Sequence, residues 1–146
     1  MRNVPPLIVP DINILVSGAT ISRSPPSQIM QLWRKGEIDI ATSPPVVQRV
    51  EQVFNYPKVR KLTGWSDRDV QEFLNDFRGA AVMKAGVTRV NAVRDPEDNA
   101  IFACAIEAAA DYIVSGDEKH ILPVGAFQGI PVVGPREFLS IFKSAV

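Results

Sequence analysis

The sequence predicts an α/β fold in which a central parallel sheet is covered by helices on both faces. Short apolar runs that fit buried strands alternate along the chain with segments of helical periodicity. Such alternation is typical of right-handed βαβ units. Aspartates also stand at the expected ends of strands and at the start of a helix, which is the edge where open α/β sheets build their sites.

In the first half of the chain, we expect two strands separated by helical segments. Residues 22–27, with two prolines and an arginine, predict a loop, and Gly36 ends the helix that follows it. Ser43 is expected to cap the next helix, because Pro44 loses no hydrogen bond at a first helical position. The expected elements are a strand at 7–9, a helix at 12–16, a helix at 28–35, a strand at 38–42, and a helix burying Val46, Val47, Val50, Val53 and Phe54.

In the second half, a variant capping box at residues 66–69 predicts the start of a helix. Residues 79–94 show no clear periodicity, apart from a strand expected near 81–83. The alanine-rich segment 97–110 is the strongest helix prediction. The other expectations are strands at 113–115 and 131–133, a helix at 135–143, and a buried face of Val70, Phe73, Leu74 and Phe77 on the capped helix.

Length and composition fit an ordinary globular protein. One domain is expected over residues 1–146, which is enough chain to bury a core. The sixteen basic and sixteen acidic residues cancel, so a nucleic-acid partner would need a local basic patch. The single cysteine, Cys104, excludes an intramolecular disulfide and should be buried. We find neither a signal peptide nor a membrane-spanning run and expect a cytoplasmic protein.

Carboxylates gather where the sheet should build its site. Asp11 and Asp117 each follow a short apolar run, while Asp95 and Asp98 stand before and at the start of the alanine-rich helix. Several carboxylates in one cleft repel one another unless a cation lies between them. Hard oxygen ligands suit Mg²⁺ or Mn²⁺. The pattern therefore predicts a metal-dependent enzyme that acts on phosphate.

Each of these residues also has a purely structural interpretation. Asp11 and Asp95 are suitable helix N-caps, and Asp117 suits a turn. Asp98 could serve only to complement the dipole of its helix. Asn13 could orient Asp11 by a hydrogen bond or cap the helix itself. Both interpretations remain open for every residue of the set.

One cluster of basic side chains lies near an aromatic residue. It comprises Lys58, Arg60 and Lys61, and Trp65 follows it. Basic groups beside an exposed aromatic ring suit single-stranded nucleic acid, which offers phosphates and bases for stacking. The alternative is a solvated surface with Trp65 packed inward. The only histidine, His120, is expected to be partly exposed.

Several segments, in order, resemble the PIN domain family. Residues 11–17, Asp-Ile-Asn-Ile-Leu-Val-Ser, look like the Asp-Thr-Asn-Val-Leu-Val-Ser opening of PIN domains. Residues 43–58 resemble the family's helix region, and residues 94–99 and 112–117 look like its two remaining acidic motifs. Residues 129–139 fit the closing pattern. The likeness is greatest to PIN proteins regarded as toxins of toxin–antitoxin pairs.

This resemblance implies a three-layer α/β/α sandwich and a Mg²⁺- or Mn²⁺-dependent endoribonuclease that cleaves single-stranded RNA. Asn13 and Ser115 would orient the metal ligands by hydrogen bonds. The resemblance also implies an antitoxin protein as a partner and leaves open a homodimer. The implied catalytic residues and metal ligands are Asp11, Asp98 and Asp117, with Asp95 acting as a further ligand or through water.

One position departs from the family's pattern. PIN domains usually carry a glutamate near the sixth residue after the serine that starts the helix, where this chain has Arg49. Glu51 is near but points to another side of the helix, and Ile12 replaces the usual threonine. Arg49 could pair with an aspartate and oppose metal binding. The alternative function is therefore a PIN-fold module with weak or no nuclease activity that binds RNA or protein. A phosphatase that forms an aspartyl-phosphate would need an aspartate in place of Asn13.

Overall fold

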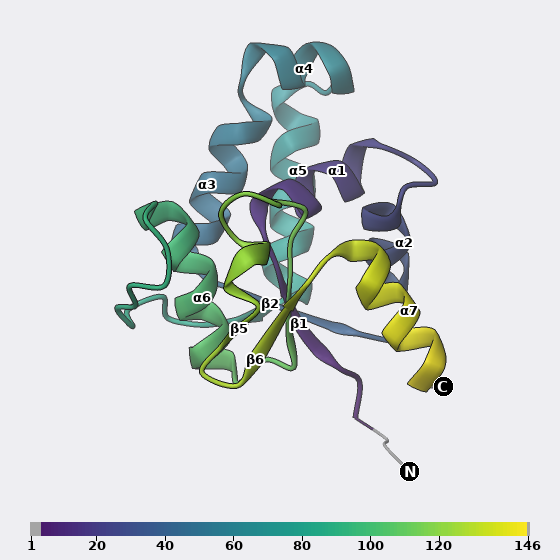
Figure 1. Cartoon of the computed structure of the whole chain (residues 1–146). Helices are drawn as coiled ribbons and strands as arrows, with labels where there is room; N and C mark the ends of the chain where they lie inside the picture. Colours follow the sequence, from purple (N-terminus) through teal and green to yellow (C-terminus); the bar gives the residue numbers. More distant parts are fainter. Residues whose placement is uncertain (1–3, 146) are drawn as a thin grey trace.

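Six strands form one sheet in the computed structural model, which describes residues 4–145 (Figure 1). The strands are β1 (Leu7–Pro10), β2 (Asp39–Thr42), β3 (Val82–Met83), β4 (Tyr112–Val114), β5 (Ala126–Phe127) and β6 (Ile130–Val133). Their order is β3-β2-β1-β4-β6-β5, and every pairing is parallel except that of β5 with β6. The predicted α/β class with a mostly parallel central sheet is confirmed.

Helices cover both faces of this sheet. They are α1 (Ile12–Thr20), α2 (Pro25–Arg34), α3 (Pro44–Phe54), α4 (Pro57–Thr63), α5 (Asp67–Ala80), α6 (Pro96–Ala108) and α7 (Pro135–Ala145), with a short 3-10 helix at Leu122–Val124. Figure 1 shows α6 on one side of the strands and α2 and α7 on the other. None of the helices in residues 4–145 has both the length and the apolar composition needed to cross a membrane.

Two helices begin with the same triplet, Ser-Pro-Pro. Ser43 occupies the N-cap position of α3, as predicted, but its buried hydroxyl makes no cap hydrogen bond in the described residues. Ser24 is the N-cap of α2, where its hydroxyl accepts a hydrogen bond from the Ser27 N–H at 3.2 Å. The predicted loop at residues 22–27 is therefore wrong in its second half, because Pro25 and Pro26 occupy the first turn of α2, where proline is well suited.

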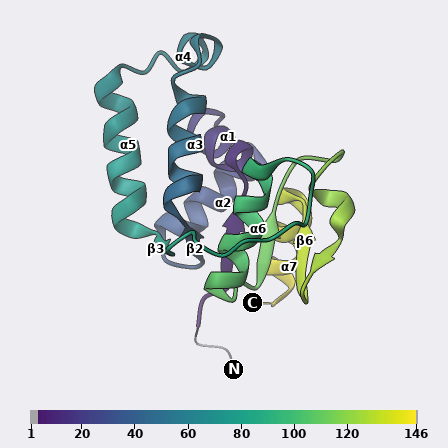
Figure 2. The same ribbon diagram turned by 90° about the vertical axis from the view of Figure 1, so that its left-hand side faces the viewer.

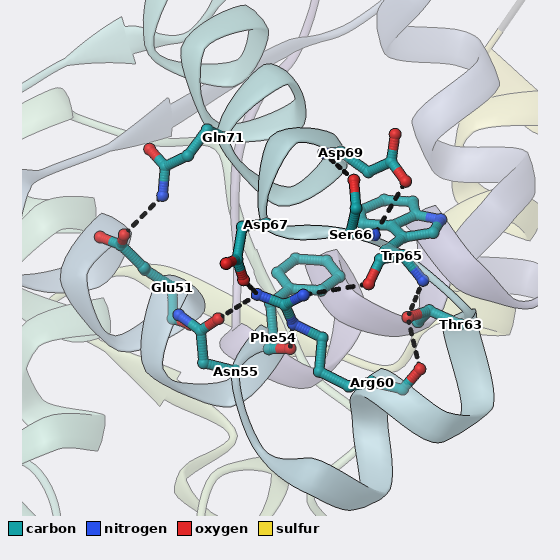
Figure 3. A network of polar contacts seen from close by, with 10 residues as sticks. All are labelled: Glu51, Phe54, Asn55, Arg60, Thr63, Trp65, Ser66, Asp67, Asp69 and Gln71. Atoms are coloured by element: carbon teal, nitrogen blue, oxygen red, sulfur yellow. Dashed lines mark hydrogen bonds and ion pairs between the residues drawn. The ribbon is translucent and has the colours of Figure 1, made fainter.

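Helices α3, α4 and α5 form an arm that extends beyond the sheet (Figure 2). Arg60 holds the corner of this arm by donating to the carbonyl oxygens of Phe54 and Trp65, at 3.1 and 3.0 Å (Figure 3). Its guanidinium also pairs with Asp67. The Trp65 ring stacks on Phe54, with centroids 5.1 Å apart. Of the two alternatives for Trp65, inward packing is therefore the observed one.

The start of α5 and its contact with α3 are also fixed by polar groups (Figure 3). The capping box is confirmed: Ser66 Oγ accepts from the Asp69 N–H at 3.1 Å, and Asp69 Oδ2 accepts from the Ser66 N–H at 2.9 Å. Gln71 Nε2 donates to Glu51 Oε2 at 2.8 Å, which joins α5 to α3. The arm thus has polar contacts at its tip and along its length.

Residues 84–95 have no regular structure, and two side chains of α6 hold them. Glu107 accepts hydrogen bonds from the backbone N–H groups of residues 86–88, at 2.7 to 3.0 Å. Asn99 Oδ1 accepts from the N–H groups of residues 92 and 93, each at 2.9 Å. The segment that leads into the start of α6 is therefore fastened along the length of that helix.

The middle of α6 lies in the core. Cys104 is fully buried there, as expected, and burial raises the pKa of its thiol to about 12. Phe102 of the same helix meets Phe127 of β5 edge to face, with ring centroids 5.3 Å apart. This packing fixes α6, and with it the acidic residues of its first turn, against the sheet.

Candidate active site

Acidic side chains meet at the carboxyl edge of the sheet. Asp11 follows β1, Asp117 lies three residues past β4, and α6 begins with Asp98 in its first turn. The Asp11 N–H donates to the carbonyl of Val114 at 2.9 Å, so the ends of the two neighbouring strands are in register. The parallel pairing thus brings together carboxylates that are about a hundred positions apart in sequence.

Asp11 is the most deeply buried of these carboxylates, being only 3% exposed. Its Oδ1 accepts a hydrogen bond from the Ile14 N–H at 2.9 Å, which makes it the N-cap of α1. Its Oδ2 accepts from the hydroxyl of Ser115, which is fully buried. Ser115 Oγ in turn accepts from the Asp117 N–H at 2.9 Å. Asp11 therefore has the structural role of a cap and also faces the other acidic residues.

Burial, with a smaller contribution from the neighbouring negative charges, raises the pKa of two of these carboxylates. Burial raises the pKa of Asp11 to about 6, against the hydrogen bonds from Ser115 and Ile14, and the charges of Asp98 and Asp117 add to the rise. Burial also raises the pKa of Asp98, with Asp95 and Asp117 adding to the rise. The site is thus a concentration of negative charge that a cation would relieve.

Asp117 and Asp95 make local contacts as well. Asp117 Oδ1 accepts from the N–H groups of Lys119 and His120, at 3.0 and 2.9 Å, and lies 3.4 Å from His120 Nδ1. Burial alone would raise the pKa of Asp117, but these backbone hydrogen bonds and His120 outweigh it and lower the pKa. Asp95 caps α6 by accepting from the Glu97 N–H at 2.9 Å. His120 is largely exposed, as expected.

The chemistry of these donors fits a hard divalent ion, but their positions do not form a complete cage. Within residues 4–145, no three Asp, Glu, His or Cys side chains are grouped closely enough to hold one metal ion. That Asp11, Asp98 and Asp117 bind one ion therefore stays a prediction. Asn13 is exposed, and no hydrogen bond joins it to Asp11 in the described residues, so the predicted orienting contact is also missing.

Arg49 of α3 pairs with a glutamate that stands next to Asp98. Its Nε is 2.7 Å from Glu97 Oε2, and its Nη1 donates to the Tyr56 hydroxyl at 2.7 Å and to Gln52 Oε1 at 3.3 Å. The hypothesis that Arg49 pairs with one of the aspartates is wrong, because Glu97 reaches the guanidinium from the first turn of α6. Nothing in the sequence pattern singles out Glu97, although it stands next to Asp98.

A hollow of about 630 Å³ opens beside the start of α6 and contains groups of both charges. Asp95 and Asp98 line it together with Arg94, Lys119 and His120. Arg94 and Lys119 are not among the residues that the sequence predicted for the site. The sequence could have indicated them by their position, since Arg94 directly precedes Asp95 and Lys119 follows Asp117 by two residues.

The three residues of the predicted basic cluster have different roles in the structure. The donors of Arg60 serve the corner of the helical arm, so this side chain has a structural role in place of a free surface charge. Lys58 and Lys61 are exposed on α4. The nucleic-acid contact predicted for this cluster therefore depends on Lys58 and Lys61.

Comparisons with known proteins agree with this arrangement. The profile of the PIN domain family matches residues 8–119, a span that includes Asp11, Asp98 and Asp117. Over the whole chain, the sequence is 26% identical, across 153 aligned residues, to an uncharacterized protein of Methanocaldococcus jannaschii, of which the match covers 97%.

Proposed function

The chain belongs to the PIN domain family, and from that premise we propose that it is a Mg²⁺- or Mn²⁺-dependent endoribonuclease that cleaves single-stranded RNA. PIN domains are generally nucleases, and the acidic edge of the sheet is the natural place for that chemistry. The observation that carries the proposal is the carboxylate of Asp11, which is only 3% exposed at the end of β1 and feels the charges of Asp98 and Asp117.

In this proposal, Asp11, Asp98 and Asp117 would hold the metal, and Asp95 would act through water. When bound, a divalent ion would lower the pKa of an attacking water and stabilise charge on the phosphate. Ser115 supports the site by fixing the orientation of Asp11 through its hydroxyl.

The cationic groups would serve the substrate. Arg94 and Lys119 line the hollow that also contains Asp98, so they can contact the phosphates on either side of the one being cleaved. This arrangement attracts the RNA backbone to a site that would otherwise repel it. Because the chain has zero formal net charge, attraction for RNA would have to come from such local cations.

The test combines cleavage with metal binding. Purified protein is mixed with an end-labelled single-stranded RNA in Mn²⁺ or in EDTA, and Mn²⁺ binding is measured separately by calorimetry. We expect cleavage only with Mn²⁺, and Asp98→Asn should weaken both cleavage and Mn²⁺ binding by at least about tenfold. Asp76→Asn removes the same charge from an exposed position of α5 and should change neither. Cleavage that persists in EDTA or in Asp98→Asn would refute the proposal.

A second candidate is a PIN-fold module that binds RNA or protein with weak or no cleavage. The incomplete grouping of the carboxylates in residues 4–145 favours it. RNA binding without any cleavage in Mn²⁺ would support this candidate. As part of the main proposal, the protein acts in the cytoplasm as the toxin of a toxin–antitoxin pair. It would then bind an antitoxin protein and could form a homodimer. Growth arrest on expression, relieved by co-expressing a neighbouring small gene, would support the toxin role.

A further inference from the structure

We propose that Arg49 and Tyr56 form a subsite that binds one nucleotide of single-stranded RNA beside the acidic cleft, with Arg49 on the phosphate and Tyr56 under the base. This inference rests on the proposed function, because it names how the same site would hold its substrate. It assigns a binding role to a residue whose sequence position suggested only an impaired metal site.

The guanidinium of Arg49 is held in place by two partners but keeps N–H groups that can bind a ligand. Glu97 binds its Nε and the Tyr56 hydroxyl binds its Nη1, each at 2.7 Å. Within the described chain, Nη2 donates to no residue, and the side chain is 29% exposed. An arginine that is already oriented and has free N–H groups is well suited to a phosphate, since little further order must be imposed on it.

Tyr56 supplies a flat surface next to this cation. Tyr56 is 44% exposed at the junction of α3 and α4, and the Arg49 Cζ atom lies 5.6 Å from its ring centroid. The hydroxyl is fixed by the bond to Arg49, so the ring is restrained. Proteins that bind single strands combine such aromatic platforms with cationic groups, because an unpaired base can stack on a ring.

The position of this pair links it to the acidic cleft. Glu97, the partner of Arg49, stands in the first turn of α6 next to Asp98. The hydrogen bond that Arg49 donates to the Tyr56 hydroxyl raises the pKa of Arg49, and the charges of Glu97 and Asp95 add to that rise, so the cation lies within electrostatic reach of the cleft. A strand whose phosphate lies at Asp98 can therefore continue over α3 towards Tyr56.

The ion pair of Arg49 with Glu97 should contribute little to stability, which makes substitutions of Arg49 informative. Arg49 and Glu97 are partly exposed, with 29% and 52% of their side chains accessible, and such ion pairs contribute little to stability. The test measures fluorescence anisotropy of a labelled single-stranded RNA of about eight nucleotides, a length within the usual site size. EDTA prevents metal-dependent cleavage, and the measurement is repeated over a range of salt concentrations.

Removal of the cation and removal of the ring should have different signatures. Arg49→Ala should weaken binding and make the slope of log affinity against log salt shallower by about 0.7, the value for one phosphate contact on a single strand. Tyr56→Ala should weaken binding by about tenfold through lost stacking. Tyr56→Phe keeps the ring and should retain most of the affinity. Arg78→Ala, at an exposed position of α5, removes the same charge and should leave the slope unchanged.

The outcomes separate this subsite from the nuclease proposal. If Arg49→Ala behaves like Arg78→Ala, or if double-stranded RNA binds as well as single-stranded RNA, the subsite is refuted even when cleavage occurs. If the expected changes are seen but the protein cuts no RNA in Mn²⁺, the subsite stands and the nuclease proposal fails. Circular dichroism and thermal melting of each variant ensure that a loss of binding is not a loss of folding.

Discussion

Ser115 donates its hydroxyl to the carboxylate of Asp11 and so joins the end of β4 to the end of β1, 104 positions apart in sequence. Because both residues are buried, no water can replace the lost donor easily. Ser115→Ala should therefore lower the free energy of unfolding by about 1–3 kcal/mol. Urea unfolding would measure this, with Ser140→Ala on the exposed face of α7 as the control. Equal losses in both variants would contradict it.

The pH dependence of stability should reveal the buried carboxylate of Asp11. Its pKa is about 6 in the folded protein, against the ordinary aspartate value of 3.8 that it regains on unfolding, so folding favours the protonated form. In the absence of metal, the stabilisation is complete below the lower pKa and is lost as the pH rises through about 6, a change of about 3 kcal/mol.

Asp11→Asn removes this ionisation and keeps an uncharged acceptor for the Ile14 N–H. The difference in unfolding free energy between wild type and variant, measured in EDTA from about pH 4 to pH 7, should therefore grow in favour of the variant. Parallel curves for the two proteins would show that Asp11 is not the group responsible. Added Mn²⁺ should raise the unfolding free energy of the wild type again at the upper end of this pH range.

Arg49→Glu should separate metal binding from RNA binding. The change places a carboxylate near Glu97 and Asp95, which adds negative charge and a ligand to the cleft. We expect Mn²⁺ binding to tighten by about tenfold, while affinity for single-stranded RNA in EDTA falls. Calorimetry and anisotropy measure the two effects. Unchanged Mn²⁺ binding would show that this position lies outside the reach of the metal.

Glu107→Gln should loosen the segment that leads into α6. Hydrogen bonds from the backbone N–H groups of Thr88 and Gly86 lower the pKa of Glu107 from 4.5 to about 2. This contribution to stability is present above about pH 4.5 and is lost as the pH falls towards 2. In Glu107→Gln, the amides of residues 86–88 should exchange hydrogen at least about tenfold faster at pH 7. Glu118→Gln, at an exposed position, is the matched control and should leave them unchanged.

Thr42→Val should stabilise the protein. The Thr42 hydroxyl at the end of β2 is buried and has no hydrogen-bond partner in the described residues, which is a cost of about 1–3 kcal/mol. Valine has nearly the same shape and a high preference for strands, so the unfolding free energy should rise by about 1 kcal/mol. Thermal melting measures the change. A lower melting temperature would mean that the hydroxyl has a partner in solution.

The sequence predicts those elements whose signals are local. The capping box before α5 and the Ser-Pro-Pro start of α3 are recognisable because the residues involved are neighbours. The same triplet at Ser24 is hidden within residues 22–27, whose composition is that of a loop. Helix α4 gives no signal because its seven residues are too few to show a buried face.

The candidate site is predictable as far as strand ends and helix starts determine it. The positions of Asp11, Asp98 and Asp117 along parallel strands and at a helix start are visible in the sequence. The side chains that pair with the residues around this site cannot be predicted from the sequence, because these pairs form between distant segments. The pairing of Arg49 with Glu97 and the binding of residues 86–88 by Glu107 join parts of the chain that only the fold brings together.

The burial of Cys104 gives the chain a built-in chemical reporter. A thiol with a pKa of about 12, enclosed by the core, cannot react with an alkylating reagent until α6 separates from the sheet. Since Cys104 is the only cysteine, the rate of alkylation of the unmodified protein measures how often that helix opens. The same helix carries Asp98 in its first turn, so this rate would report, without any label, whether a bound ion or RNA holds the two sides of the cleft together.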